Sequence, residues 1–107
     1  MTTEIKNAII ESTTLTLNEG HGIPSCMIHL NYGGSSQGFG GYDLRYYGLK
    51  MITSILETVG EERWEYLPGN HVRARIEGGL IVAIGHIMED KWYYPKAEDK
   101  KQDGKDL

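Results

Sequence analysis

The sequence has little of what covalent or membrane-embedded structures require. Cys26 is the only cysteine among 107 residues, which excludes an internal disulfide and a cysteine-based zinc cluster. No run of about 18 apolar residues occurs, so a membrane-spanning helix is not expected. The first ten residues, MTTEIKNAII, lack the basic region of a signal peptide, and no glycine follows Met1 to accept a myristoyl group. We therefore expect a cytoplasmic protein that makes no membrane contact.

Basic residues are also too few for a general nucleic-acid-binding protein. The chain has 11 Lys and Arg against 15 Asp and Glu, a formal net charge of −4. The last segment, residues 96–107, has four lysines and four acidic residues and no hydrophobic period, so we expect a disordered polar tail. The predicted domain, residues 1–95, then carries the whole imbalance. An acidic body without a basic stripe disfavours direct nucleic-acid binding and suits a basic protein partner.

The first part of the chain predicts a β-hairpin. Residues 4–17 are rich in β-branched side chains, which favours a long strand. Its apolar positions change from even (Ala8, Ile10) to odd (Leu15, Leu17), so a bulge near residues 12–14 would keep them all on one face. Residues 18–24 have turn chemistry, and residues 25–32 predict the second strand.

The second half predicts a helix and another hairpin. Leu49, Ile52, Leu56 and Val59 fall at helical spacing, and Gly60 stands where a left-handed residue would end the helix. Residues 71–77 and 80–88 predict strands joined by a two-residue turn at residues 78–79. The order β-β-α-β-β predicts an α+β fold, an antiparallel sheet of about four strands with one packed helix. A partly rolled small barrel is compatible with the same pattern.

The segment NYGGSSQGFGGYD, residues 31–43, contains five of the 14 glycines and predicts a loop before the helix. Backbone N–H groups in glycine-rich turns can form a concave nest for an anion, and a helix N-terminus adds partial positive charge. The segment lacks the Gly-Lys-Ser/Thr ending of a P-loop and does not fit the dinucleotide-binding fingerprint. The alternative is a structural passage of the chain against the sheet, with Phe39 in the core.

Candidates for catalysis or metal binding are weak. No two histidines have the i, i+4 spacing of a helical metal site. Cys26 lies in an apolar strand pattern, and Ser35 and Ser36 lack the strand-turn-helix context of a hydrolase nucleophile. No pattern places two acidic residues across a substrate. We therefore expect no catalytic residue, no metal and no cofactor.

Aromatic residues flank the glycine segment and close the predicted domain. Tyr42, Tyr46 and Tyr47 follow the glycines, and residues 92–94 read Trp-Tyr-Tyr. Such side chains can stack on a nucleotide base, anchor a protein interface, or cover the end of a small core. For Trp64 and Trp92 we expect the last of these roles, and for the tyrosines all three stay open.

Two segments together resemble the signature segments of a family of small uncharacterised bacteriophage and prophage proteins. They are LNYGGSSQGFGGY, residues 30–42, and AIGHIMEDKWYYP, residues 83–95. The resemblance covers roughly residues 5–95 and departs from the family at residues 43–48, where the lead into the helix is short. It implies a phage protein acting in the host cell cytoplasm. Small accessory phage proteins of this kind often counter bacterial defence.

Several functional hypotheses follow from this resemblance. The leading one is a non-catalytic counter-defence protein, similar to anti-CRISPR proteins, whose acidic face binds a bacterial defence protein such as a Cas effector. The second is a sponge that sequesters a nucleotide second messenger through the glycine-rich segment. A small nucleotide-acting enzyme and a structural virion protein are further alternatives, and a homodimer or larger oligomer is compatible with each of the binding functions.

The predicted ligand- or partner-binding residues are the glycine-rich segment, the residues that follow it, and one tryptophan. They are Gly33, Gly34, Ser35, Ser36, Gln37, Gly38, Phe39, Gly40, Gly41, Tyr42, Asp43 and Trp92.

Overall fold

The computed structural model describes residues 3–18 and 22–95. Six strands form one antiparallel sheet in the order β3-β2-β1-β4-β5-β6. The strands are β1 (Thr3–Asn18), β2 (Ile23–Tyr32), β3 (Ser35–Asp43), β4 (His71–Glu77), β5 (Leu80–His86) and β6 (Trp92–Tyr93). The helices are α1 (Leu44–Tyr47), α2 (Leu49–Val59) and the short 3₁₀ helix η1 (Trp64–Tyr66).

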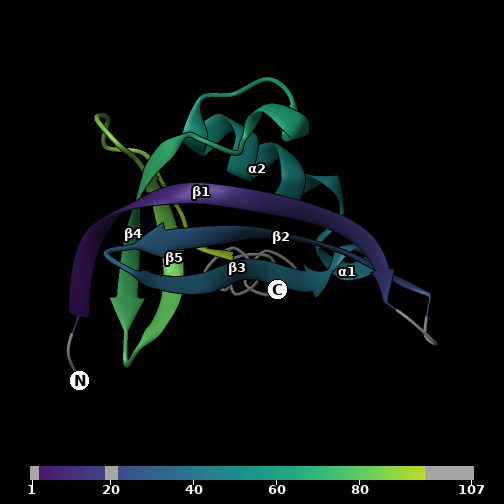
Figure 1. Ribbon diagram of the computed structural model, residues 1–107. Coiled ribbons are helices and arrows are strands. Elements are labelled where there is room, and N and C mark those ends of the chain that lie inside the picture. The colour runs from purple at the N-terminus through teal and green to yellow at the C-terminus, as the bar shows by residue number, and fades with distance from the viewer. Residues whose placement is uncertain (1–2, 19–21, 96–107) are drawn as a thin grey trace, which may run out of the picture.

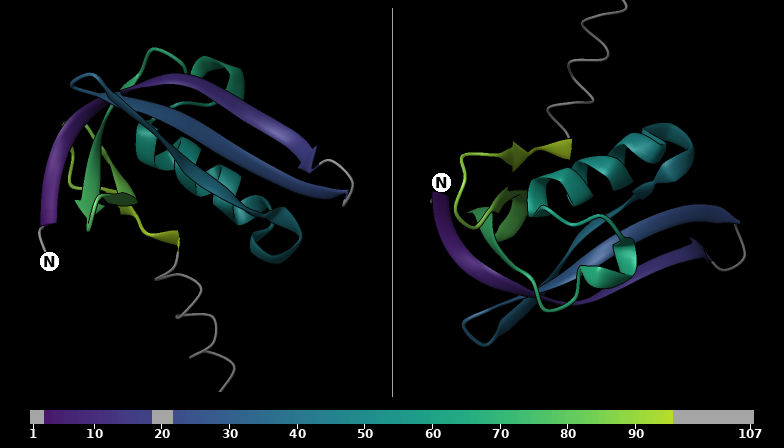
Figure 2. Two further views of the ribbon diagram at one scale, coloured as in Figure 1. Left: turned by 60° about the horizontal axis from the view of Figure 1, so that its bottom comes forward. Right: turned by 90° about the horizontal axis from the view of Figure 1, so that it is seen from above.

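The α+β class and the antiparallel sheet are confirmed, but the expected number of about four strands is too low. The glycine-rich segment forms β3 instead of a loop, and Trp92–Tyr93 adds the short β6. The sheet curves around α2, which lies on its concave side (Figure 1, Figure 2). The predicted tail, residues 96–107, lies outside the described residues. Within the described part of the chain, no helix is long and apolar enough to cross a membrane.

Strand β1 joins the two halves of the sheet. Its first part, as far as Ile9, pairs with β4, and its second part, from Ile9 onward, pairs with β2. Ile9 therefore lies opposite His71 on one side and Asn31 on the other. The register shifts between Ile10 and Ser12, which places a bulge slightly before the predicted position at residues 12–14.

The bulge has the predicted effect on side-chain direction. Leu15 lies opposite the buried Cys26, and Leu17 lies opposite Pro24, so both leucines point to the same face as the core. They are nevertheless 58% and 68% exposed, because the end of the β1–β2 hairpin runs past the helices (Figure 2). A repeating apolar pattern thus continues beyond the part of the strand that the core covers.

The core lies between the concave face of the sheet and α2. Its members are buried apolar side chains from β1, β2, β3, β4, β5, β6, α2 and the segment after η1: Ala8, Ile10, Cys26, Ile28, Leu30, Phe39, Met51, Ile55, Val59, Leu67, Val72, Ala74, Ile76, Ile81, Ile84 and Tyr93. Helix α2 ends at Gly60, whose φ of 92° and N–H bond to the Leu56 carbonyl confirm the predicted stop. The predicted helix face is only partly right: Met51 and Ile55 are buried, whereas Leu49 is 76% exposed.

The Gln37 side chain connects β3 to the start of β5, two strands that are not neighbours in the sheet. Its side-chain nitrogen donates to the carbonyl of Gly79 at 3.0 Å, and its side-chain oxygen accepts from the Ile81 N–H at 2.8 Å. Gly79 closes the predicted β4–β5 hairpin and Ile81 belongs to β5, so one side-chain amide connects β3 to the start of β5. In the core, Phe39 of β3 meets Tyr93 of β6 edge-to-face, with ring centroids 6.3 Å apart.

Candidate functional site

The glycine-rich segment is a paired strand, which corrects the expectation of a loop before a helix N-terminus. It pairs with β2 from Tyr32–Ser35 at one end to Ser25–Asp43 at the other. The backbone groups that face β2 are therefore engaged in the sheet, and the segment does not form a continuous nest of free amides. Pairing with β2 offsets the conformational entropy that glycine loses on ordering.

Three local constraints explain why glycine stands at four positions of this segment. Gly33 and Gly34, with φ of 64° and 89°, form the two-residue turn between β2 and β3. Gly38 lies under Met27, whose sulfur would clash with an added Cβ atom. Gly40 has φ of 107°, and an added Cβ would be 2.8 Å from the Cys26 carbonyl oxygen. It stands next to a register shift in the β2–β3 pairing.

The other predicted residues of β3 divide between its two faces. Gln37 and Phe39 lie opposite Leu30 and Ile28 and point inward, and Phe39 is in the core as the structural alternative expected. Ser36 is exposed on the outer face, where its hydroxyl donates to the Glu11 carboxylate at 3.2 Å. Ser35 is exposed at the start of the strand. The backbone of residues 41–43 belongs to β3, and the side chains of Tyr42 and Asp43 lie outside the described part of the structure.

Trp92 is separated from these residues. Its indole ring packs over Gly85, where an added Cβ would be 2.8 Å from the ring atoms, and the Arg73 guanidinium lies 4.9 Å from the ring centroid. Successive strand residues point to opposite faces, so the neighbouring Tyr93, and not Trp92, meets the glycine-rich strand through Phe39. The sequence does not specify which of these two aromatic residues points inward.

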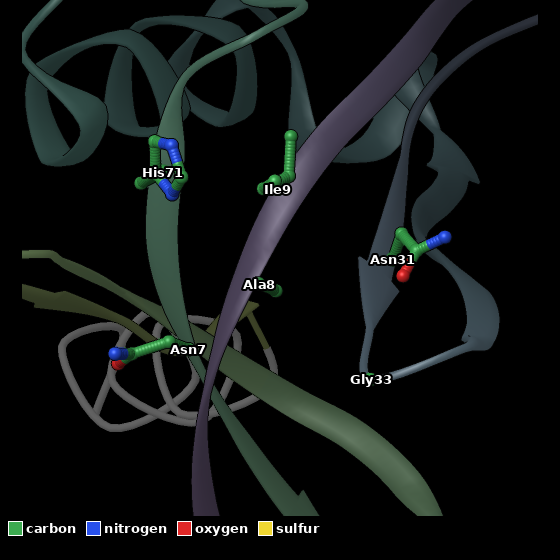
Figure 3. A pocket seen from close by; sticks show the side chains of 6 residues that line it. All are labelled: Asn7, Ala8, Ile9, Asn31, Gly33 and His71. Atoms are coloured by element: carbon green, nitrogen blue, oxygen red, sulfur yellow. The ribbon is translucent and has the colours of Figure 1, made fainter.

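A small pocket lies on the outer face of the sheet, beside the Gly33–Gly34 turn. Its volume is about 210 Å³, and it is open to solvent. Its lining residues are Asn7, Ala8, Ile9, Asn31, Gly33 and His71. Figure 3 shows Asn7 and His71 on one side of β1 and Asn31 and Gly33 on the other. The pocket therefore forms where β1 changes its pairing partner from β4 to β2.

Of the predicted site residues, only Gly33 lines this pocket. Asn31 is held by the bulged Glu11, whose carboxylate accepts from the Asn31 amide at 3.0 Å, and its own oxygen accepts from the Gly34 N–H at 3.4 Å. The only sequence signal for Asn7 and Asn31 is a polar residue at an outward position of a predicted strand. Any solvated sheet face shows the same pattern, so the signal does not distinguish a site. The pocket is smaller than the roughly 300–1,000 Å³ of typical ligand sites.

The described side chains offer little nucleophilic or metal chemistry. Cys26 is 1% exposed, and burial raises the pKa of its thiol to about 11, so the thiol stays protonated at neutral pH. Residues 3–18 and 22–95 contain no group of three His, Cys, Asp or Glu side chains that could hold a metal ion. The His86 Nδ1 atom accepts from the N–H groups of Met88 and Glu89, which gives this histidine a role in shaping a turn.

The acidic excess of residues 1–95 lies in two segments of the chain. Residues 57–65, from the end of α2 to η1, contain four glutamates and one arginine, and the turn at residues 89–91 reads Glu-Asp-Lys. The Lys91 ammonium donates to the Glu57 carbonyl at 3.2 Å, so this turn lies against the end of α2. We call these two segments the acidic end. It has six acidic and two basic side chains, a net charge of −4, which leaves the rest of residues 1–95 with five of each.

Comparison of the chain with protein-family models, with curated proteins and with solved structures finds no match.

Proposed function

We propose that this protein is a phage-encoded, non-catalytic counter-defence protein that inhibits a bacterial immune effector by binding it directly. The observation that carries the proposal is the acidic end, which holds the whole net charge of residues 1–95. A Cas effector presents a basic channel to nucleic acid, and a concentrated negative patch would compete for that channel. The resemblance of residues 30–42 and 83–95 to phage proteins supplies the biological context.

The properties of the described residues are compatible with binding and offer nothing that favours turnover. The thiol of Cys26 is buried and protonated, and the pocket beside Gly33 is lined by two asparagines and a histidine without a charged partner for catalysis. The acidic end, in contrast, is held on a packed scaffold. The carboxylate of Glu61 accepts from Asn70 at 3.1 Å, and Lys91 anchors the second segment to α2.

Inhibition of purified guide-loaded Cas effectors tests the proposal. Target-DNA cleavage is measured while the full chain is titrated, at low and at raised salt. We expect inhibition by at least one effector class, weakened by salt because exposed charges are screened. The double variant Glu62→Gln, Glu65→Gln should weaken inhibition about tenfold, which corresponds to about 1.4 kcal/mol.

A matched control removes the same charge from the neutral part of the surface. The variant Glu4→Gln, Glu77→Gln changes two exposed or half-exposed carboxylates of β1 and β4 and should inhibit as the parent does. Equal loss of inhibition in both double variants would contradict a role for the acidic end. Absence of inhibition across the effector panel would contradict the proposed function as a whole.

The pocket supports a second candidate, sequestration of a nucleotide messenger. Asn7, Asn31 and His71 offer side-chain hydrogen-bonding groups of the kind that read a base edge, and Gly33 of the β2–β3 turn borders them. A thermal-shift screen against cyclic and linear nucleotides tests this candidate. A melting temperature that rises with ligand, and rises less in His71→Ala, would favour the sponge. Turnover of any nucleotide in the same samples would favour an enzyme instead.

A further inference from the structure

The end of β1 leaves one side of its backbone without a partner. On the side facing β4, Ile10 is the last residue with backbone partners: its N–H donates to the Asn70 carbonyl and its carbonyl accepts from the Gly69 N–H. Ser12 to Asn18 pair with β2 on the other side. Among residues 3–18 and 22–95, no segment pairs with β1 beyond Ile10 on the side away from β2.

This edge is open in space as well as in hydrogen bonding. The end of β1 extends past η1, which stands over the middle of the strand (Figure 1, Figure 2). Residues 14–17 are exposed, including the two leucines described above. We call Thr14 to Asn18 the free edge.

The free edge lacks the devices that usually block pairing between sheet edges. Such devices are charged residues, proline, bulges and very short strands. The sequence of the free edge is Thr-Leu-Thr-Leu-Asn, with neither charge nor proline, and the bulge at Glu11 lies before it. The two outer strands of the sheet are better protected, because β6 has only two residues and β3 is linked to β5 through Gln37.

The free edge is complementary to itself. If two copies pair antiparallel about Thr16, Leu15 of each chain lies opposite Leu17 of the other, and Thr14 lies opposite Asn18. Paired residues point to the same face, so four leucines would meet on the concave side. In the sequence, the nearest charged residues are Glu11 before this segment and Glu19 directly after it, and both lie outside the five paired residues.

We propose that the free edge pairs with the same edge of a second copy to form a two-fold symmetric dimer with one continuous twelve-stranded sheet. Two-fold pairing uses one patch twice, which is the commonest way in which soluble proteins form oligomers. A second copy of the chain carries the same net charge of −4, so the two copies repel each other. This repulsion is smallest where they meet through an uncharged strand, and the free edge is uncharged and self-complementary. The dimer leaves the acidic end on each copy available, so this proposal goes beyond the proposed function and does not depend on it.

Sedimentation velocity of the full chain over a wide concentration range tests the dimer. We expect a species of twice the chain mass that dissociates on dilution, because the paired segment is short. Thr16 points outward, opposite Ser25, so Thr16→Lys leaves the core unchanged and places two like charges directly opposite at the symmetry axis. This variant should dissociate at a concentration at least tenfold higher than the parent. Met88→Lys, at an 83% exposed site, adds the same charge and should dimerise normally.

A cross-linking experiment identifies the contact directly. Residues facing each other across an antiparallel pair have Cα atoms about 4.5 to 5.5 Å apart, within the roughly 4.4 to 6.8 Å that a disulfide spans. Thr16→Cys should therefore form a covalent dimer rapidly on oxidation, whereas Met88→Cys should not. The buried Cys26 does not interfere. A chain that stays monomeric at every concentration, a dimer that survives Thr16→Lys, or equal cross-linking of the two cysteine variants would overturn the proposal.

Discussion

Residues of the glycine-rich strand are constrained one at a time. At Gly40 the backbone has φ of 107°, and both a carbonyl oxygen of β2 and the Met51 side chain lie within 3.0 Å of where a Cβ would be. Gly33 also has a positive φ, of 64°, but nothing lies within 4 Å of that position. The two glycines differ in the space around them, so they should respond differently to substitution.

Gly40→Ala should lower the free energy of unfolding by about 1–3 kcal/mol, because it combines backbone strain with a clash against backbone atoms. Gly33→Asn should change it by less than about 0.5 kcal/mol, since asparagine is favoured in two-residue hairpin turns. Urea unfolding followed by circular dichroism measures both. If the two variants lose similar free energy of unfolding, the close contact at Gly40 does not contribute to the cost of substitution.

Cys26 makes the stability of the fold dependent on alkaline pH. Its pKa is about 11 in the folded chain and near 9.0 when the thiol is exposed, so the unfolded state loses its proton first. The stabilising contribution is complete below pH 9 and declines as the pH rises toward 11. Cys26→Ala should show a smaller decline over this range than the parent, measured by urea unfolding at each pH. A parallel decline in both proteins would show that other groups cause it.

At the scale of elements, one side chain takes the place of a missing strand pair. Strands β3 and β5 are not hydrogen-bonded neighbours in the sheet, yet the Gln37 amide offers the donor and acceptor that a backbone peptide would offer. The same amide nitrogen donates to the Tyr32 hydroxyl at 3.0 Å, which ties the bridge to β2. The curvature of the sheet is therefore linked to a specific polar contact as well as to core packing.

Gln37→Leu should destabilise the fold by about 1–3 kcal/mol, because the partly buried Ile81 N–H loses its acceptor. Hydrogen exchange of the Ile81 amide should accelerate in this variant, while the amides that pair β1 with β2 stay protected. Ser35→Ala, at an exposed position of the same strand, serves as the control and should change neither quantity. Unchanged exchange at Ile81 in Gln37→Leu would contradict the bridging role.

At the scale of the whole molecule, the core draws on nearly every element, whereas the net charge lies in only two segments. Core residues come from every strand, from α2 and from Leu67 after η1, so these elements share one hydrophobic core. The net negative charge lies at the acidic end, and the neutral free edge lies at the tip of the β1–β2 hairpin. The two surfaces that we propose for partners are thus formed by different segments of the chain.

A chain with one core should unfold in a single step, and the segment 96–107 should add nothing to that step. Residues 1–95 alone are expected to show the same urea midpoint and the same slope, about 1–3 kcal/mol per molar urea, as the full chain. Tryptophan fluorescence and far-ultraviolet circular dichroism should give coincident transitions. A lower midpoint for the shortened chain would mean that the last twelve residues contact the domain.

The sequence by itself determined the features that depend on local periodicity and local conformation. These are the strands on either side of the bulge in β1, the stop of α2 at Gly60, the turn at residues 78–79 and the α+β class. Alternation with period two and the left-handed conformation of glycine are properties of a few consecutive residues, so a pattern is enough to predict them.

Only the tertiary structure decided which residues meet. Glycine disfavours a strand locally, and the glycine-rich segment becomes β3 because β2 lies beside it. The curvature of the sheet brings Gln37 to Ile81, 44 positions apart, and points Tyr93 rather than Trp92 toward Phe39. The length of α2 limits the core and leaves Leu15 and Leu17 exposed. Such contacts depend on the direction and curvature of whole elements, which no single segment of the sequence specifies.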